Sequence, residues 1–339
     1  MATASETLKT SCSLCNSTEN LNRCAGCKVV QYCSRDHQTL DWPSHRPSCV
    51  KVKKAFQKLN QEEETLRNHP GDFLTPANPF VNGVGHFWGH LDTRDYMRAR
   101  YAYIESVLKF NTHRAVETAL EHLMDMFRLC RGDNMGLRYI TPHCFLRLGQ
   151  DQECYDFIKW WVTCDPKGEY DWGDMTLPYL NIKDADVFEP IDVFLTKFPS
   201  ISFLAAITLL KIRLLIDLQS LQRTRKEVGA LIPQEVLDSI QSAAVGSIVS
   251  KNKRILERED HTAEIKDLQA QIQKSFDRLT KANKHFWPAI VKPGNNLTIR
   301  PQAYGMGSVA EMQIMLQYCY SAWAETPGAI GVIEELLKN

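Results

Sequence analysis

The first fifty residues of the chain are dense in cysteine and histidine, the side chains that most often bind zinc. The eight side chains, spaced C-x2-C-x8-C-x2-C-x5-C-x3-H-x7-H-x3-C, are those of Cys12, Cys15, Cys24, Cys27, Cys33, His37, His45 and Cys49. A C-x2-C turn can direct two thiolates at one metal, and residues four apart share a face of a helical turn. The pattern therefore gives four chelating pairs, enough to close two tetrahedral zinc sites. Thiolates and imidazoles favour zinc over harder cations.

The main alternative to a metal site is a set of free or disulfide-bonded cysteines. Disulfides are typical of secreted proteins, and the stretch Met1–Thr10 is polar, without the apolar core of a secretory signal. We therefore expect an intracellular protein, in the nucleus or the cytoplasm, whose clustered cysteines bind metal. The remaining cysteines are scattered, and we expect them to be small buried apolar side chains: Cys130, Cys144, Cys154, Cys164 and Cys319.

The residues around the clustered cysteines resemble a known family, the MYND zinc finger, which shares this ligand order. The matching segments are Cys24-Ala25-Gly26-Cys27, Tyr32-Cys33-Ser34 and Asp41-Trp42-Pro43-Ser44-His45. The resemblance implies two interleaved zinc sites, one formed by Cys12, Cys15, Cys33 and His37 and the other by Cys24, Cys27, His45 and Cys49. The spacing alone leaves other pairings open.

Both implied zinc ions have four protein ligands, so neither has an open position where a water could be activated. We therefore expect two structural Zn²⁺ ions. A segment this short cannot bury a core of its own, and zinc binding should supply most of its folding free energy.

MYND fingers are similar in binding short proline-containing peptides, and on the family pattern Gln38 and Trp42 match the positions that contact the peptide. An exposed indole suits a proline ring, and a glutamine side chain can pair with a peptide backbone. The alternative is that Trp42 packs the small zinc core. Ala25 stands where other MYND fingers have a polar residue, which puts one further peptide contact in doubt.

The chain as a whole is electrically balanced, with 40 Lys and Arg against 40 Asp and Glu. Proteins that bind nucleic acid mainly through phosphates carry a basic excess, so we do not expect nucleic acid as the primary partner. The most apolar stretch, Ile201–Leu218, is interrupted by Lys211 and Arg213. Because a membrane span needs about 20 nearly uncharged residues, we predict a buried helix here and no membrane partner.

Beyond the finger the periodicity is helical almost throughout, and strand-type alternation is nearly absent. We predict a finger at 1–50, a helix (Val50–Asn68) and irregular connector within 51–92, and an all-α body at 93–339. Helices are expected near residues 93–110, 113–130, 134–148, 150–163, 189–198, 202–225, 233–247, 258–283, 308–324 and 327–337. The antiparallel pairs at 113–163 have the size of tetratricopeptide-like repeats, which form concave binding surfaces. The alternative is an irregular helical domain without a groove.

A few residues define the expected elements further. Thr112 and Ser308 are placed to cap the helices that follow them. A narrow apolar seam suggests a helix-hairpin partner or a short coiled coil, and consists of Ile265, Leu268, Ile272, Phe276 and Leu279. His86 and His90 stand four apart, but the glycines around them favour loop packing over a metal pair.

The layout resembles fungal MYND-type proteins in which a helical region without a SET domain follows the finger. This similarity gives no function for the helical region. We expect an adaptor or scaffold whose finger binds a proline-containing peptide while the helical body binds a second protein, in a setting such as transcriptional regulation or protein turnover.

The enzymatic alternative is lysine methylation, because MYND fingers also occur inside SET-domain methyltransferases. In those enzymes a β-rich segment precedes the finger, whereas only eleven residues precede Cys12. The single Asn-His pair, Asn68-His69, lies in the connector and not in a cofactor motif. We therefore expect that the chain is not an enzyme.

Overall fold

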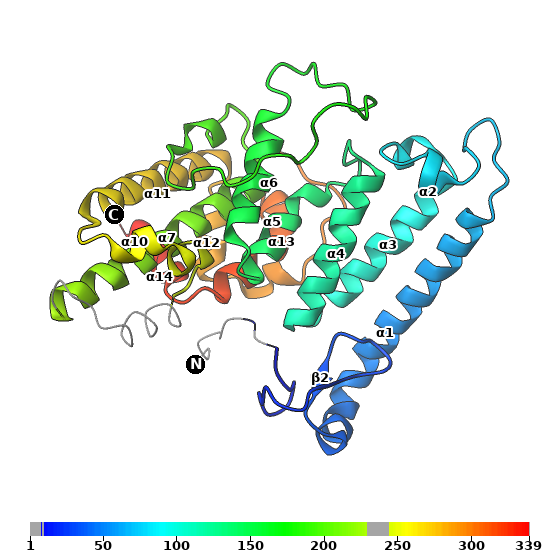
Figure 1. The fold of residues 1–339 in the computed structure, drawn as a ribbon, viewed down its shortest axis with the longest axis horizontal. Coiled ribbons are helices and arrows are strands. Elements are labelled where there is room, and N and C mark those ends of the chain that lie inside the picture. Colours follow the sequence, from blue (N-terminus) through cyan, green and yellow to red (C-terminus); the bar gives the residue numbers. More distant parts are fainter. Residues whose placement is uncertain (1–7, 9, 229–243, 339) are drawn as a thin grey trace. The chain divides into compact units, whose positions relative to one another are not determined.

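The computed structural model describes residues 8, 10–228 and 244–338 and is largely helical beyond the N-terminal finger (Figure 1). It contains two compact units. The finger unit comprises Leu8–Cys144 with Tyr170–Tyr179, and the helical unit comprises Phe145–Glu169 with Leu180–Asn339. The predicted all-α body is confirmed, since the only strands among the described residues are two short ones in the finger. The division into 1–50, 51–92 and 93–339 stays a prediction.

The finger contains β1 (Asn22–Arg23) and β2 (Gln31–Tyr32), which pair antiparallel, and the first part of α1 (Arg35–Arg67). The hydroxyl of Ser34 caps α1 by accepting from the N–H of His37 at 3.2 Å. The helix predicted at Val50–Asn68 is thus the second half of a longer one that begins inside the finger. Pro43 and Pro47 lie within α1 although they lack the N–H that a helix interior uses.

The rest of the finger unit packs along α1. Helix α3 (Thr93–Val107) packs on α1, and α4 (His113–Leu129) packs on α3. Thr112 caps α4 as predicted, accepting from the N–H of Ala115 at 3.2 Å. The connector holds only the short α2 (Pro79–Asn82) and η1 (Phe87–Gly89).

The helix predicted at 134–148 is shorter than expected. A 3-10 turn, η2 (Leu137–Tyr139), precedes α5 (Thr141–Arg147). The buried carboxylate of Asp133 accepts from the N–H groups of Leu137 and Arg138 at 2.7 and 3.0 Å and so holds the turn. Pro142 lies in the first turn of α5, where its missing N–H costs nothing, and not at a kink. The tetratricopeptide-like arrangement is not confirmed.

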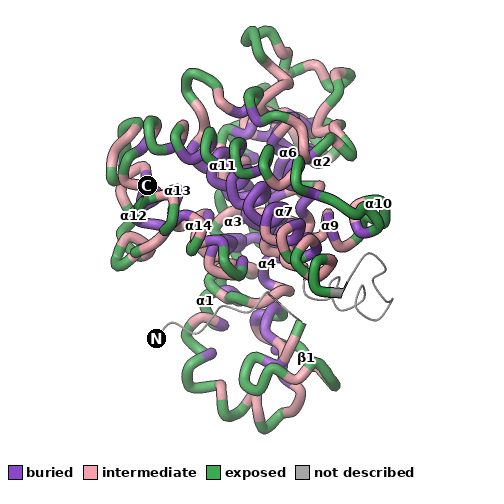
Figure 2. Tube along the Cα trace, turned by 90° about the vertical axis from the view of Figure 1, so that its left-hand side faces the viewer, coloured by how far each residue is buried: buried purple, intermediate pink, exposed green. Residues whose placement is uncertain are grey.

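The core of the helical unit is built around α7 (Ile201–Val228), whose first half is buried on all sides (Figure 2). Helix α11 (Thr262–Ala282) packs along α7, and α6 (Asp151–Thr163) packs against it as well. The buried part of the predicted seam on α11 is Leu268, Ile272, Phe276 and Leu279. The seam therefore belongs to a helix that pairs with α7.

The remaining elements of the helical unit are short or follow α11. They are η3 (Ile191–Phe194), α9 (Ser247–Lys251), α10 (Lys253–Glu257), α12 (Phe286–Val291), η4 (Gly294–Leu297), α13 (Val309–Ala324) and α14 (Ala329–Leu336). The helix predicted at 189–198 is wrong beyond η3, because Pro190 and Pro199 bound a segment too short to propagate. The helix predicted at 233–247 lies mostly outside the described residues. Ser308 caps α13 as predicted.

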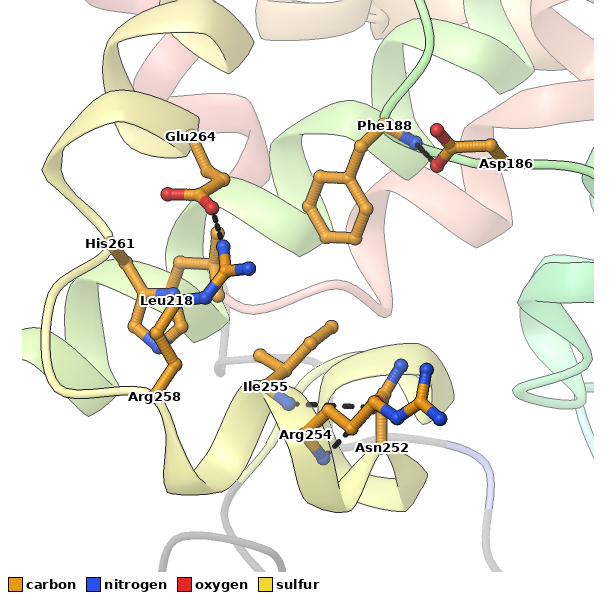
Figure 3. Close-up of a pocket in the computed structure, with 9 residues that line it drawn as sticks. All are labelled: Asp186, Phe188, Leu218, Asn252, Arg254, Ile255, Arg258, His261 and Glu264. Atoms are coloured by element: carbon orange, nitrogen blue, oxygen red, sulfur yellow. Dashed lines mark hydrogen bonds and ion pairs between the residues drawn. The ribbon is translucent and has the colours of Figure 1, made fainter.

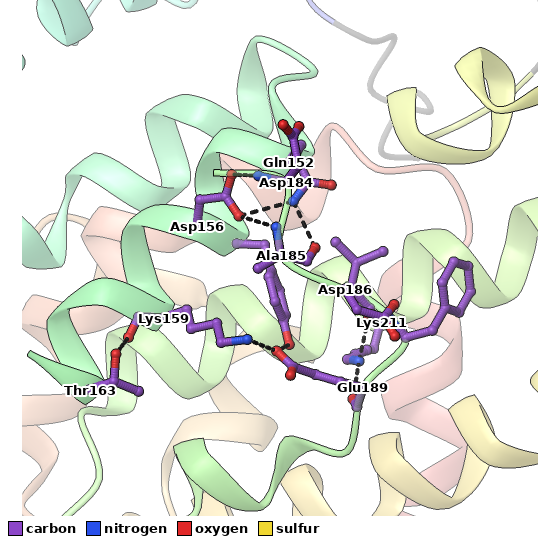
Figure 4. Close-up of polar contacts among 12 residues, drawn as sticks. Gln152, Asp156, Lys159, Thr163, Asp184, Ala185, Asp186, Glu189 and Lys211 are labelled. Atoms are coloured by element: carbon purple, nitrogen blue, oxygen red, sulfur yellow. Dashed lines mark hydrogen bonds and ion pairs between the residues drawn. The ribbon is translucent and has the colours of Figure 1, made fainter. Parts of the chain in front are cut away.

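Lys211 on α7 is fully buried, and its ammonium group has hydrogen-bond partners. Its Nζ donates to the carbonyls of Val187 and Glu189 at 2.5 and 3.1 Å, and burial lowers the pKa of its ammonium group to about 8 (Figure 4). Residues on α6 hold the same loop: Asp156 accepts from the N–H groups of Asp184 and Ala185 at 2.9 and 3.0 Å.

Among the described helices, none is long and apolar enough to cross a bilayer.

Candidate metal centre

The finger fold brings four chelating pairs to two places. Cys12 and Cys15 lie in the first loop, Cys24 and Cys27 in the turn between the strands, and Cys33 directly after β2. The other three side chains all lie on α1: His37, His45 and Cys49. One helix therefore contributes to both places, which explains why it begins inside the finger.

The first cluster consists of Cys12, Cys15, Cys33 and His37, whose ligand atoms all lie within 4.8 Å of one another. The Sγ atoms of Cys15 and Cys33 are 3.6 Å apart, and Nδ1 of His37 lies 3.6 Å from Sγ of Cys12 and 3.1 Å from Sγ of Cys33. Cys12 is buried, whereas Cys15 is exposed. This cluster therefore lies at the surface of the finger.

The second cluster consists of Cys24, Cys27, His45 and Cys49, all of them buried. The Sγ atoms of Cys24 and Cys49 are 3.7 Å apart, and Nε2 of His45 lies 3.4 Å from Sγ of Cys24 and 3.6 Å from Sγ of Cys27. A Cβ on Gly26 would lie 2.7 Å from Sγ of Cys49, so this position has no room for a side chain. Lys28 completes the turn in a left-handed conformation, with φ of 63°.

These distances fit a bound zinc ion in both clusters. With Zn–S bonds of about 2.3 Å, tetrahedral geometry separates two sulfurs by about 3.8 Å. The measured S···S separations of 3.6 and 3.7 Å are close to this value and far from a disulfide bond, and none of the described cysteines is disulfide-bonded. The two sets are also those that the MYND resemblance implies.

The electrostatics of the thiols favour a cation at the same places. Burial raises the pKa of Cys12, but hydrogen bonds from the backbone N–H groups of Leu14, Cys33 and Cys15 outweigh it and lower the pKa to about 6. Burial and the neighbouring thiolates raise the pKa of Cys49 to about 12. Thiolates so close together repel each other, and a divalent cation among them would remove that repulsion.

His45 is suited to ligation because burial lowers its pKa and keeps the ring neutral. Its ring also packs 5.9 Å from the ring of Trp42 and 5.4 Å from that of Phe110, which follows α3. A hydrogen bond of 2.6 Å from the hydroxyl of Thr112 to the carbonyl of Val29 makes a second link between the finger and the helices. The finger is therefore packed onto the rest of its unit.

Trp42 and Gln38 lie one turn apart on α1, as the peptide-groove prediction requires. Trp42 is 40% exposed while one side of its ring contacts His45, so the indole is both anchored and accessible. Gln38 is half-buried, and Leu40 on the same helix is 70% exposed. The geometry permits the predicted groove and leaves the assignment of its ligand a prediction.

The connector contains a third group that the sequence did not single out, formed by His69, Asp72 and Asp92. Nδ1 of His69 accepts from the N–H of Gly71 at 3.0 Å, and its Nε2 lies 3.5 Å from Asp92. Both carboxylates also bond Thr75. These contacts hold the loop together. The H-x2-D spacing is the only sequence signal that pointed to them.

The helical unit has a cavity of about 320 Å³ beside α9, α10 and α11 (Figure 3). Two of its polar side chains are already paired: Arg258 pairs with Glu264, and Oδ1 of Asn252 accepts from the N–H groups of Arg254 and Ile255, whereas the buried Nε2 of His261 has no hydrogen-bond partner. The ring of Phe188 projects into it from the loop before α7. No nucleophile–base pair lines it among the described residues, so the cavity gives no reason to predict catalysis.

Comparison with known proteins supports the finger and nothing beyond it. Residues 12–49 match the family model of the MYND finger. The chain is similar to the Rho GTPase-activating protein gacZ of Dictyostelium discoideum (35% identity over 54 residues, 16% of this chain and 5% of that protein). It is similar to Egl nine homolog 1 of Mus musculus (44% over 46 residues, 14% and 12%). It is also similar to SET domain and MYND-type zinc finger protein 6 of Schizosaccharomyces pombe (40% over 58 residues, 17% and 11%).

The chain spans at most 12% of the length of these relatives, so their other activities are not carried over. No solved structure matches significantly. The N-terminal segment is a MYND finger, a zinc-binding domain that commonly mediates protein interactions.

Proposed function

We propose that the chain is a zinc-dependent adaptor in which the MYND finger binds short proline-containing peptides and the helical unit binds a second protein. The observation that carries the proposal is Trp42, an anchored indole with 40% of its surface exposed beside the buried second cluster. Side chains of this kind bind proline rings well, because they bury a large area at low entropic cost. Gln38, one turn away, would hold the peptide backbone.

The two zinc ions have a structural role in this proposal. All four donors of each cluster are protein side chains, which leaves no coordination position for a substrate or a water. The zinc ions therefore fix the fold of the finger, and this fold positions the residues of the proposed peptide groove. The proposed setting is intracellular, in transcriptional regulation or protein turnover.

We also propose that the chain is not a lysine methyltransferase. The SET-containing relative is similar only over the finger, and the SET fold needs strands, whereas the two strands of the described residues lie in the finger. Titration of the protein with S-adenosylmethionine in a calorimeter, beside a methyl-transfer assay on histones, tests this point. Saturable binding together with lysine methylation would contradict it.

Replacing Trp42 by Ala tests the adaptor proposal. We expect Trp42→Ala to abolish or weaken at least tenfold the binding of proline-containing peptides, measured by fluorescence anisotropy on a synthetic panel. Both zinc ions should remain, as measured by elemental analysis. The wild-type affinity should be micromolar, about −7 to −8 kcal/mol, because a short peptide buries little area and must be ordered.

Leu40→Ala is the matched control, because Leu40 is on the same helix and even more exposed. It should change peptide affinity less than twofold. Loss of zinc from Trp42→Ala would show that Trp42 packs the metal core, and the groove assignment would then fall.

A further inference from the structure

The helical unit has a groove where the ends of three helices meet, lined by three basic side chains and one acidic side chain: Lys197, Arg278, Lys281 and Glu311. From Arg278 to Ala310 the chain has five basic residues and no acidic one: Arg278, Lys281, Lys284, Lys292 and Arg300. The whole chain is balanced, so this excess is local. The groove lies at the N-terminal ends of α7 and α13 and the C-terminal end of α11, and its cavity has a volume of about 230 Å³.

Two bulky apolar side chains line this groove and are largely in water. Phe198 is 68% exposed and Met306 is 73% exposed. Tyr304 and Val309, close to Met306 in the chain, are exposed too. Single exposed apolar residues are ordinary, but two that line the same hollow favour an interaction surface.

Hydrogen bonds from Arg278 hold one wall of the groove in place. Arg278 donates from Nε and Nη2 to the carbonyl of Thr196 at 3.1 and 2.6 Å and from Nη2 to the carbonyl of Lys197 at 2.6 Å. These bonds hold the segment before α7 against α11 and present Phe198. Buried Ile201 lines the same cavity, so the apolar surface continues inward.

The cations at the groove have no internal anion to neutralise them. Lys197 and Lys281 are exposed and have no carboxylate partner among the described residues; the ammonium of Lys197 lies 5.4 Å from the ring centre of Phe198. Glu311 is the one acidic side chain that lines the groove. It accepts from the N–H of Gly307 at 2.7 Å and from Nδ2 of Asn283 at 3.1 Å, so it joins the turn before α13 to the end of α11.

We propose that this groove binds an acidic peptide segment with one bulky apolar side chain. The apolar side chain enters the cavity that Phe198 and Met306 line, and the flanking carboxylates pair with Lys197 and Lys281. A cavity of this volume is below the range of small-molecule sites, about 300–1,000 Å³, and suits a single side chain. The proposal rests on the adaptor function proposed above and assigns the second binding surface to residues of the helical unit.

The test uses the full-length protein and a labelled synthetic peptide of Asp, Glu, Gly and Ser with one central Phe, followed by fluorescence anisotropy. We expect micromolar binding that weakens with added salt, and at least a tenfold loss in Lys197→Glu/Lys281→Glu. Met306→Asp should weaken binding by a similar factor through the apolar side of the groove. Because all three residues are exposed, circular dichroism and the urea midpoint should stay unchanged.

The control variant Lys251→Glu/Lys266→Glu changes the same charge at exposed lysines elsewhere in the helical unit and should alter affinity less than twofold. Equal losses in both double variants would overturn the proposal, since binding would then follow net charge alone. Unchanged affinity when the Phe of the peptide is replaced by Ser would also overturn it. So would displacement of the peptide by phosphatidylserine vesicles or by single-stranded DNA at lower concentration than by unlabelled peptide.

Failure of this groove and failure of the finger can be told apart. Trp42→Ala should leave binding of the acidic peptide intact, and Lys197→Glu/Lys281→Glu should leave binding of the proline-containing peptide intact. If only the acidic peptide fails to bind, the adaptor function of the finger stands and the assignment of the second surface falls.

Discussion

The finger and the core around α7 keep their backbone ordered in two different ways. In the finger, five of the eight cysteine and histidine donors are buried, and the main buried apolar side chains are Val29, Val30 and Tyr32. In the helical unit, the first half of α7 is buried on every face. The first arrangement depends on a ligand, and the second depends on the hydrophobic effect. The two regions should therefore fail under different conditions.

Removing zinc should have the largest effect and should be confined to the finger unit. Apparent binding free energies for structural zinc are about 10–16 kcal/mol at neutral pH. We expect two zinc ions per chain by elemental analysis, and we expect a chelator to abolish amide protection in residues 12–49 while the amides of α7 remain protected. Hydrogen exchange before and after chelation measures this. A single zinc ion, or none, in carefully prepared protein would contradict the assignment.

Truncating the core of α7 should have the opposite effect. Leu210 is fully buried, and Leu210→Ala should lower the free energy of unfolding of the helical unit by about 2–5 kcal/mol, because it leaves a cavity. Urea denaturation followed by circular dichroism measures the change. The zinc content should stay at two ions, and its loss would show that the finger depends on this core.

Gly26→Ala should separate the two clusters. The new Cβ would lie 2.7 Å from Sγ of Cys49, so the second cluster must shift while the first does not. Overpacking of this kind costs about 1–3 kcal/mol. We expect weaker binding of one zinc ion in a competition titration with a chromophoric chelator. Gly305→Ala is the control, because no atom lies within 4 Å of the added Cβ. If Gly26→Ala weakened the binding of both zinc ions equally, the two clusters would not be independent.

The smallest effect is expected at the link between finger and helices. Thr112→Ala removes both the cap of α4 and the hydrogen bond to the carbonyl of Val29, and should cost about 1 kcal/mol. Thr112→Ser keeps the hydroxyl and should restore most of the loss. The thermal midpoint of each variant measures this, and identical midpoints for Ala and Ser would show that the hydroxyl contributes nothing.

The parts of the molecule that depend on local spacing could be predicted from the sequence. The MYND pattern led to the two sets of donors that the structure brings together, and Thr112 and Ser308 cap helices as expected. The apolar stretch Ile201–Leu218 is a buried helix, and it tolerates the burial of Lys211 because the ammonium group donates to two backbone carbonyls. These predictions needed only neighbours in the chain or a known motif.

The parts that depend on distant contacts could not be predicted. Arg131 is buried and donates to the carbonyls of Asp174 and Leu177, both at 2.8 Å, and to the hydroxyl of Tyr170. This is how the segment Tyr170–Tyr179 joins the finger unit although 25 residues of the helical unit, Phe145–Glu169, precede it. The start of α1 was also missed: Pro43 and Pro47 are residues that disfavour a helix interior, yet both lie within α1.

The continuity of α1 with the finger also bears on the order of folding. Nucleation is the slow and costly step of helix formation, and elongation takes about a nanosecond per residue. A zinc ion that binds Cys33 and His37 fixes the first turn of α1 around Ser34, so the metal would start a helix of 33 residues. We therefore expect stopped-flow mixing of metal-free protein with zinc to show a helical signal whose rate rises with zinc concentration. A rate independent of zinc would mean that α1 forms first and the metal follows. In the first case, the supply of metal decides when α1 forms.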